Sequence, residues 1–157
     1  MTTLGDVTAA LDALYPPELA EPWDAVGLVC GDPSAPVRRV LLAVDPTPEV
    51  AAEAVAGGYD LLLTHHPLYL GGTTTVAGTD PKGRVVHDLV RAGSALFVAH
   101  TNADRAAGGV SDALAALFFA LQQIAHHRQA ERDIGCPARA FQHPRRPGPI
   151  AGGRLAE

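Results

Sequence analysis

Residues 60–68 read DLLLTHHPL, and this stretch decides the fold. Three consecutive leucines, residues 61–63, form a short apolar run within 60–64, which predicts a β-strand there. The run leads directly into the pair His65-His66, and Pro67 then biases the backbone of His66 towards an extended conformation. Because two imidazoles follow the carboxyl end of this strand, the sequence predicts a sheet with a ligand-binding site at that edge.

Strands and helices alternate outward from this stretch. Residues 39–44 (RVLLAV) and 95–99 are two further apolar strands, and the first has the continuous apolar character of a buried parallel strand. Residues 48–56 and 81–92 are predicted helices, each opened by a capping residue followed by proline. This order predicts an α/β fold built from βαβ units, with a mainly parallel sheet and flanking helices.

The predicted elements continue on both sides of this core. A helix over residues 4–14 has apolar positions at helical spacing, and Thr3 with Asp6 fits a capping box at its start. Residues 26–30 are a short predicted strand. After the last strand we expect a polar loop and then a third helix with Ser111 as its cap.

Composition divides the chain into three regions. The 157 residues suit one domain, and 47% hydrophobic against 18% charged residues is enough for a core. We predict an α/β metal-binding domain over 1–117, a helical continuation over 118–134 and a Pro/Arg-rich irregular tail over 135–157. Net charge is −8 over the first region and +3 over the rest, but only one aromatic residue, Phe141, lies among the arginines of 128–154, so we expect no clear nucleic-acid partner.

Several classes of protein are disfavoured. The longest clean apolar run, 113–121, is far too short to span a bilayer, and no basic segment at the N-terminus marks a signal peptide. Cys30 and Cys136 form neither a Cys-x-x-Cys pair nor a disulfide framework. No nucleophile elbow, P-loop or dinucleotide fingerprint is present. We therefore expect a soluble, cytoplasmic protein without a membrane partner.

Residues with metal-ligand chemistry follow three successive strands. His65 and His66 follow one strand, His100 follows the next with Asp104 four residues on, and Asp45 follows a third. The carboxyl ends of parallel strands meet at one edge of a sheet, where such folds bind ligands. We interpret Asp45 as a turn residue before a helix. We expect His100 to orient a carboxylate beside the metals or to shuttle a proton.

The adjacent pair His65 and His66 leaves two arrangements open. Neighbouring side chains of a strand point to opposite faces, so either the chain bends at Thr64 or the two rings serve two different ions. The restriction that Pro67 places on His66 favours the second arrangement. Two divalent ions roughly 3.5–4 Å apart with a bridging carboxylate form a known hydrolytic centre, in which Asp104 is the natural bridge. Zinc, iron, manganese and cobalt all suit these ligands.

Three motifs together resemble one family. Residues 64–68 (THHPL), 100–104 (HTNAD) and 23–28 (WDAVGL) are similar to the THHPL, HTNxD and WDNVGL motifs of the NGG-interacting-factor-three-like family, whose bacterial members are called GTP cyclohydrolase 1 type 2 homologs. Ala25 stands where asparagine is usual. The resemblance covers residues 1 to about 117.

The resemblance implies a toroidal homohexamer with a dinuclear metal centre and assigns His65, His66 and Asp104 to ligand positions. It also implies further ligands from a C-terminal His-x-x-x-Glu motif. His127 and Glu131 have that spacing and share one helical face. Two interpretations stay open: the pair closes the metal site, or it is an ordinary solvated pair at a helix end.

These observations lead to two functional hypotheses. The first is a dinuclear metal-binding protein that acts as a metal-dependent hydrolase on a nucleotide or a similar phosphorylated or cyclic small molecule. The second is a non-enzymatic oligomeric assembly or regulatory protein whose metal site is structural or vestigial, with apolar surface that promotes self-association.

Overall fold

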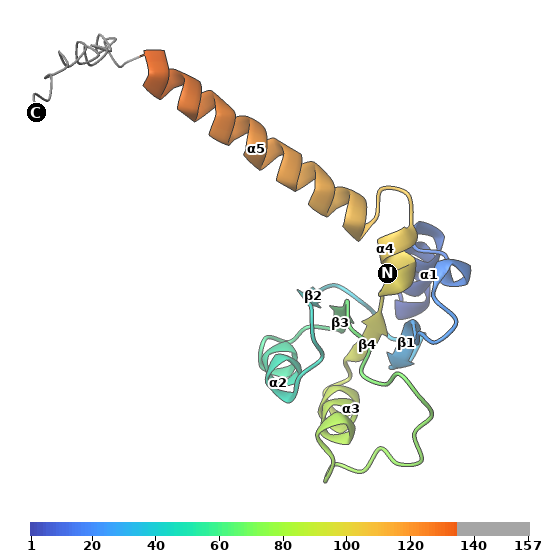
Figure 1. Cartoon of the computed structure of the whole chain (residues 1–157). Coiled ribbons are helices and arrows are strands. Elements are labelled where there is room, and N and C mark those ends of the chain that lie inside the picture. The colour runs from blue at the N-terminus through green and yellow to red at the C-terminus, as the bar shows by residue number, and fades with distance from the viewer. Residues whose placement is uncertain (135–157) are drawn as a thin grey trace, which may run out of the picture. The chain divides into compact units, whose positions relative to one another are not determined.

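The structure is a computed structural model that describes the backbone of residues 1–134 and the side chains as far as Ile124. Contacts divide the chain into two units, Met1–Phe118 and Phe119–Glu157. The elements in chain order are α1 (Leu4–Leu14), the 3-10 helix η1 (Pro17–Leu19), β1 (Gly27–Cys30), β2 (Val40–Ala43), α2 (Pro48–Ala56), β3 (Leu61–Thr64), α3 (Pro81–Arg91), β4 (Ala95–Val98), α4 (Thr101–Arg105) and α5 (Val110–Ile134) (Figure 1).

The four strands form one mixed sheet in the order β1-β4-β3-β2. β2 pairs with β3 and β3 with β4 in parallel, and the connections between them contain the helices α2 and α3. β1 pairs with β4 antiparallel. The predicted α/β class with a mainly parallel sheet is therefore confirmed. Because β3 and β4 are central neighbours, their carboxyl ends lie side by side.

The core is split between the two faces of the sheet. Successive residues of a strand point to opposite faces, so Leu61 packs with Leu4 of α1 and Phe97, while Leu62 packs with Val85 of α3. All five of these side chains are at most 2% exposed. Figure 1 shows α1 apart from α2 and α3, which lie together. The strand β3 is thus buried on both sides immediately before the histidine pair.

The predicted helix starts are largely confirmed. Thr3 Oγ1 accepts a hydrogen bond from Asp6 N at 3.2 Å, while Thr3 N donates to Asp6 Oδ2 at 2.9 Å, which completes the capping box of α1. The side chains of Thr47 and Asp80 cap α2 and α3 by accepting hydrogen bonds from backbone N–H groups of the first turn, without the reciprocal bond of a capping box. Ser111 is not the cap of the last helix, because α5 begins one residue earlier.

Two further expectations are wrong. Residues 39–44 form a strand but not a buried one. β2 is the edge strand: Leu41 and Ala43 pack against the core on the α2 side, whereas Leu42 on the opposite face is 71% exposed. The expected polar loop after β4 instead contains α4. Buried Asn102 stabilises this short helix through tertiary contacts that local propensity does not reveal, donating from Nδ2 to the Tyr15 carbonyl at 2.7 Å.

The helix α5 runs over 25 residues and contains the apolar run 113–121 near its start. Within the part of the chain that is described, no helix combines the length and the hydropathy needed to cross a bilayer.

A glycine is required where the segment before α3 passes over that helix. A Cβ at Gly83 would lie 2.1 Å from the Ala77 carbonyl oxygen, so a side chain fits only if backbone moves. We expect Gly83→Ala to lower the free energy of unfolding by about 1–3 kcal/mol, measured by urea denaturation. Gly72→Ala is the matched control, since a Cβ there meets nothing within 4 Å. Equal midpoints for the two variants would contradict the clash.

Candidate metal centre

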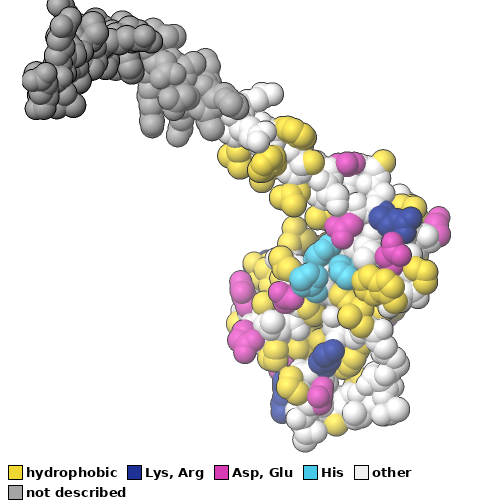
Figure 2. All heavy atoms as spheres, in the orientation of Figure 1, with side chains coloured by type: hydrophobic (Ala, Val, Ile, Leu, Met, Phe, Trp, Pro, Cys, Tyr) yellow, Lys and Arg dark blue, Asp and Glu magenta, His cyan; other side chains and the backbone are white. Residues whose placement is uncertain are grey.

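Three histidines meet where two central strands end. His65 and His66 directly follow β3, and His100 lies two residues beyond β4. One ring nitrogen of each lies within 4.8 Å of the others, and the ring centroids are 5.0–5.6 Å apart. Figure 2 shows histidine side chains gathered in one patch on the surface of the molecule. The parallel pairing of β3 with β4 thus produces the cluster that the strand order predicts.

The backbone bends immediately after Thr64, so two adjacent histidines contribute to one cluster. Thr64 is buried, and its Oγ1 donates to the His66 carbonyl at 3.0 Å. The His65 and His66 amides still donate to the carbonyls of Ala43, the last residue of β2, and of Val44, the residue after it. The sequence left open whether the chain bends at Thr64 or the two rings serve two different ions. The structure shows the bend.

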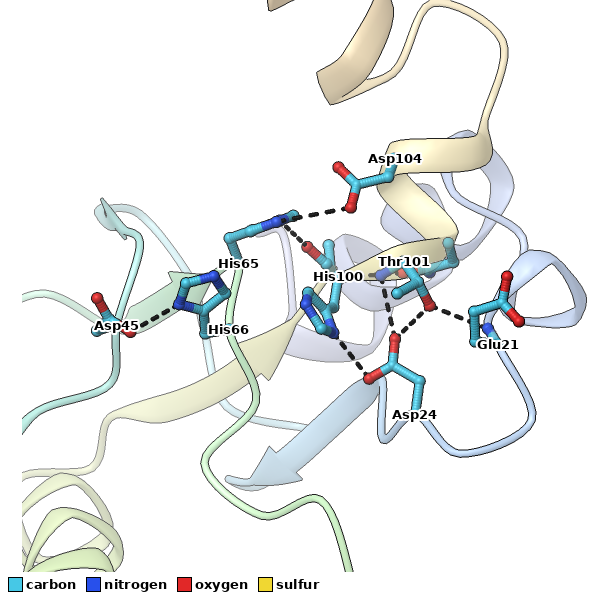
Figure 3. A network of polar contacts seen from close by, with 10 residues as sticks. Glu21, Asp24, Asp45, His65, His66, His100, Thr101 and Asp104 are labelled. Carbon is cyan, nitrogen blue, oxygen red and sulfur yellow. Dashed lines mark hydrogen bonds and ion pairs between the residues drawn. The ribbon is translucent and has the colours of Figure 1, made fainter.

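Each of the three imidazoles is oriented by an oxygen at its Nδ1. The partners are Ala99 O at 3.1 Å from His65, Asp45 Oδ1 at 2.7 Å from His66 and Asp24 Oδ1 at 2.9 Å from His100 (Figure 3). Carbonyl and carboxylate oxygens only accept hydrogen bonds, which assigns the proton of each neutral ring to Nδ1 and the lone pair to Nε2. This pattern, with one nitrogen bonded to an oxygen and the other available, is typical of metal-ligating histidine.

The carboxylate of Asp104 completes the group. It projects from α4, and its Oδ2 lies 3.7 Å from His65 Nε2. The structure therefore brings three predicted site residues, His65, His66 and Asp104, into one place together with His100. The other two predicted ligands, His127 and Glu131, fall in the part of α5 whose side chains lie outside the described residues.

Asp24 is a member of the site that sequence reasoning missed. Its side chain is fully buried and accepts from His100 Nδ1 on one oxygen and from Thr101 N on the other. Burial alone would raise the pKa of Asp24, but hydrogen bonds from His100, Thr101 and Ala25 outweigh it and lower the pKa from 3.8 to about 2. The available signal was the WDAVGL segment, which carried the family resemblance but received no chemical role.

Asp45 also has a contact that the sequence did not indicate. It lies in a bend, as the turn interpretation expects, and its carboxylate bonds His66. Both side chains are about half exposed, at 59% and 48%. The pair is therefore open to solvent, in contrast to the buried Asp24.

The donor set is chemically suited to a divalent transition metal. Imidazole nitrogens with a carboxylate oxygen fit zinc, iron, manganese or cobalt and do not select among them. Side-chain exposure rises from 15% at His100 to 26% at His65 and 48% at His66. A centre with three protein nitrogens and an open side resembles catalytic rather than structural zinc sites, which are closed by four protein ligands.

The family model for Duf34/NIF3 (NGG1p interacting factor 3) matches residues 2–143. The chain belongs to the Duf34/NIF3 family. The resemblance found in the three sequence motifs is therefore confirmed.

Relatives within the Duf34/NIF3 family are closely similar but much longer. A "GTP cyclohydrolase 1 type 2 homolog" of Streptomyces coelicolor is 64% identical over 115 residues, covering 73% of this chain and 40% of the relative. A protein of the same name from Mycobacterium tuberculosis is 58% identical over 112 residues, covering 71% of this chain and 29% of that one. The chain thus spans at most two fifths of the length of either relative.

Solved structures of related proteins share the fold. A Bacillus cereus protein related to NIF3 superimposes with a TM-score of 0.68 at 34% identity, covering 74% of this chain and 32% of that one. Reduced HcgD from Methanocaldococcus jannaschii gives the same TM-score at 29% identity, covering 74% of this chain and 46% of that one. The Duf34/NIF3 fold is therefore the fold of this chain's α/β part.

Proposed function

We propose that this chain binds divalent metal through His65, His66 and His100, with Asp104 beside them. The observation that carries the proposal is the shared orientation of the three rings, each of which keeps Nε2 available because an oxygen holds Nδ1. Unliganded surface histidines have no reason to adopt this arrangement three times within 4.8 Å. The dinuclear centre implied by the resemblance would add a second ion, for which Asp104 is the bridging donor.

We further propose that the centre supports hydrolysis of a phosphorylated or cyclic small molecule. A bound divalent ion polarises a substrate oxygen and lowers the pKa of a bound water. The protein holds the donor atoms fixed, since the strand ends and the Nδ1 partners restrain the rings. Its half-exposed His66 leaves the centre open to a small molecule. The name GTP cyclohydrolase, carried by the relatives, is consistent with a nucleotide substrate.

Metal content tests the proposal directly. The full chain, purified and loaded with Zn²⁺, is expected to retain one ion per chain after gel filtration if only the three histidines bind, and two if the dinuclear centre forms. Mass spectrometry of the metals gives the ratio, and hydrolysis of GTP and of bis(p-nitrophenyl) phosphate, with and without chelator, gives activity. Less than half an ion per chain would contradict metal binding.

The second hypothesis, a non-enzymatic oligomer, is supported by the exposed apolar side chains of the edge strand β2. Light scattering after gel filtration distinguishes the two. A metal-loaded oligomer, such as the homohexamer that the resemblance implies, that shows no turnover favours the assembly role. Turnover that rises with metal occupancy and is lost with chelator favours the hydrolase.

A further inference from the structure

We propose that Asp24 is a positioning residue that sets the tautomer and the direction of the His100 ring, so that His100 Nε2 faces the metal. This inference rests on the proposed metal centre. It assigns a role to a buried carboxylate 76 residues away in sequence from the imidazole it contacts.

The contacts of Asp24 use both of its oxygens. Oδ1 accepts from His100 Nδ1 at 2.9 Å and from Ala25 N at 2.8 Å, and Oδ2 accepts from Thr101 N at 3.1 Å and from the Thr101 hydroxyl. Four donors therefore converge on one side chain with no exposed surface, and Figure 3 shows those of His100 and Thr101. An acceptor-only carboxylate satisfies all four, which explains why this position holds an aspartate.

The Thr101 hydroxyl is itself oriented. Its oxygen accepts from Glu21 N at 3.0 Å, so its single proton is directed at Asp24. Arg105 of the same helix forms an ion pair with Glu21 at 3.0 Å. The segment before β1 is thus held against α4 at Glu21, three residues before Asp24, which restrains the position of the Asp24 carboxylate.

The consequence for the ring follows from hydrogen-bond chemistry. A carboxylate at Nδ1 requires a proton on that nitrogen, which leaves Nε2 of a neutral imidazole as the acceptor atom. His100 is only 15% exposed in its side chain and lies 5.0 Å from the His65 ring centroid. A ring fixed in this way presents its Nε2 to the space shared with His65 and His66.

The test replaces Asp24 with asparagine. An amide has one acceptor oxygen and one donor nitrogen, so either orientation sets an NH₂ group against a backbone N–H of Ala25 or Thr101. We expect Asp24→Asn to lower Zn²⁺ affinity by about 10–100-fold, because losing the hydrogen-bond partner of a metal-bound histidine has an effect of this size. In the metal-free full chain, ¹⁵N NMR of the imidazoles is expected to show that His100 loses its single Nδ1–H tautomer.

Asp60→Asn is the matched control. Asp60 also receives two backbone amides, from Arg38 and Arg39, but it precedes β3 and contacts no histidine. We expect this variant to leave both the His100 tautomer and the Zn²⁺ affinity within twofold of the parent. Unchanged tautomer and affinity in Asp24→Asn would overturn the inference.

The readouts separate this inference from the metal proposal. If the parent chain binds no Zn²⁺, the proposed function fails, whereas the NMR tautomer of His100 still tests the role of Asp24. If Asp24→Asn does not fold, the parent spectrum alone decides: a His100 proton on Nε2 in the metal-free chain overturns the inference, and one on Nδ1 supports it.

Discussion

Replacing His65 with alanine is expected to lower Zn²⁺ affinity by more than roughly 100-fold. Removing a residue that only hydrogen-bonds to a metal ligand already lowers metal affinity by about 10–100-fold, and His65 is a proposed ligand itself. His65 occupies the centre of the cluster: its ring lies 5.2 Å from His66 and 5.0 Å from His100, and its Nε2 faces Asp104. Competition with a chromophoric chelator measures the affinity.

The control for this substitution is His87→Ala. His87 is an exposed residue of α3 and is not a member of the three-histidine cluster. It should leave Zn²⁺ affinity unchanged while removing the same number of imidazoles. If both variants bind Zn²⁺ as the parent does, the three-histidine centre does not hold the metal.

The largest effect on stability is expected from Leu62→Ala. Leu62 is fully buried in β3 and packs among side chains of α2, α3 and β4, so removing most of its side chain leaves a cavity. We expect a loss of about 2–5 kcal/mol in the free energy of unfolding, measured by urea denaturation with an unchanged slope.

A leucine of the neighbouring strand provides the comparison. Leu42 of β2 is 71% exposed, so Leu42→Ala removes the same atoms from solvent-exposed surface and should change stability by at most about 0.5 kcal/mol. A loss at Leu42 equal to that at Leu62 would show that the edge of the sheet is covered in solution.

The sequence predicted those parts of the site that depend on local patterns. Alternating strands and helices predicted the parallel neighbours β3 and β4, and this alone brings His65, His66 and His100 to one edge. The sequence did not reveal the bend after Thr64, which a side-chain hydrogen bond supports and which brings both adjacent rings into one cluster. That the two rings serve two ions stays a prediction.

The remaining features depend on contacts between distant residues. Asp24 and Asp45 reach their histidines across 76 and 21 residues, and no spacing rule relates such pairs. The exposure of Leu42 follows from the position of β2 at the end of the strand order, and apolar character alone cannot separate an edge strand from a central one.

The antiparallel pairing of β1 with β4 has a consequence for biosynthesis. The Asp24–His100 contact closes a loop of 76 residues, so the earlier partner leaves the ribosome well before the later one exists. At roughly 5–20 residues per second, this interval lasts several seconds, during which Asp24 lacks its native partner His100. We therefore expect β1 to join the nascent sheet late, and the three-histidine cluster to form only after β4 and the start of α4 have emerged.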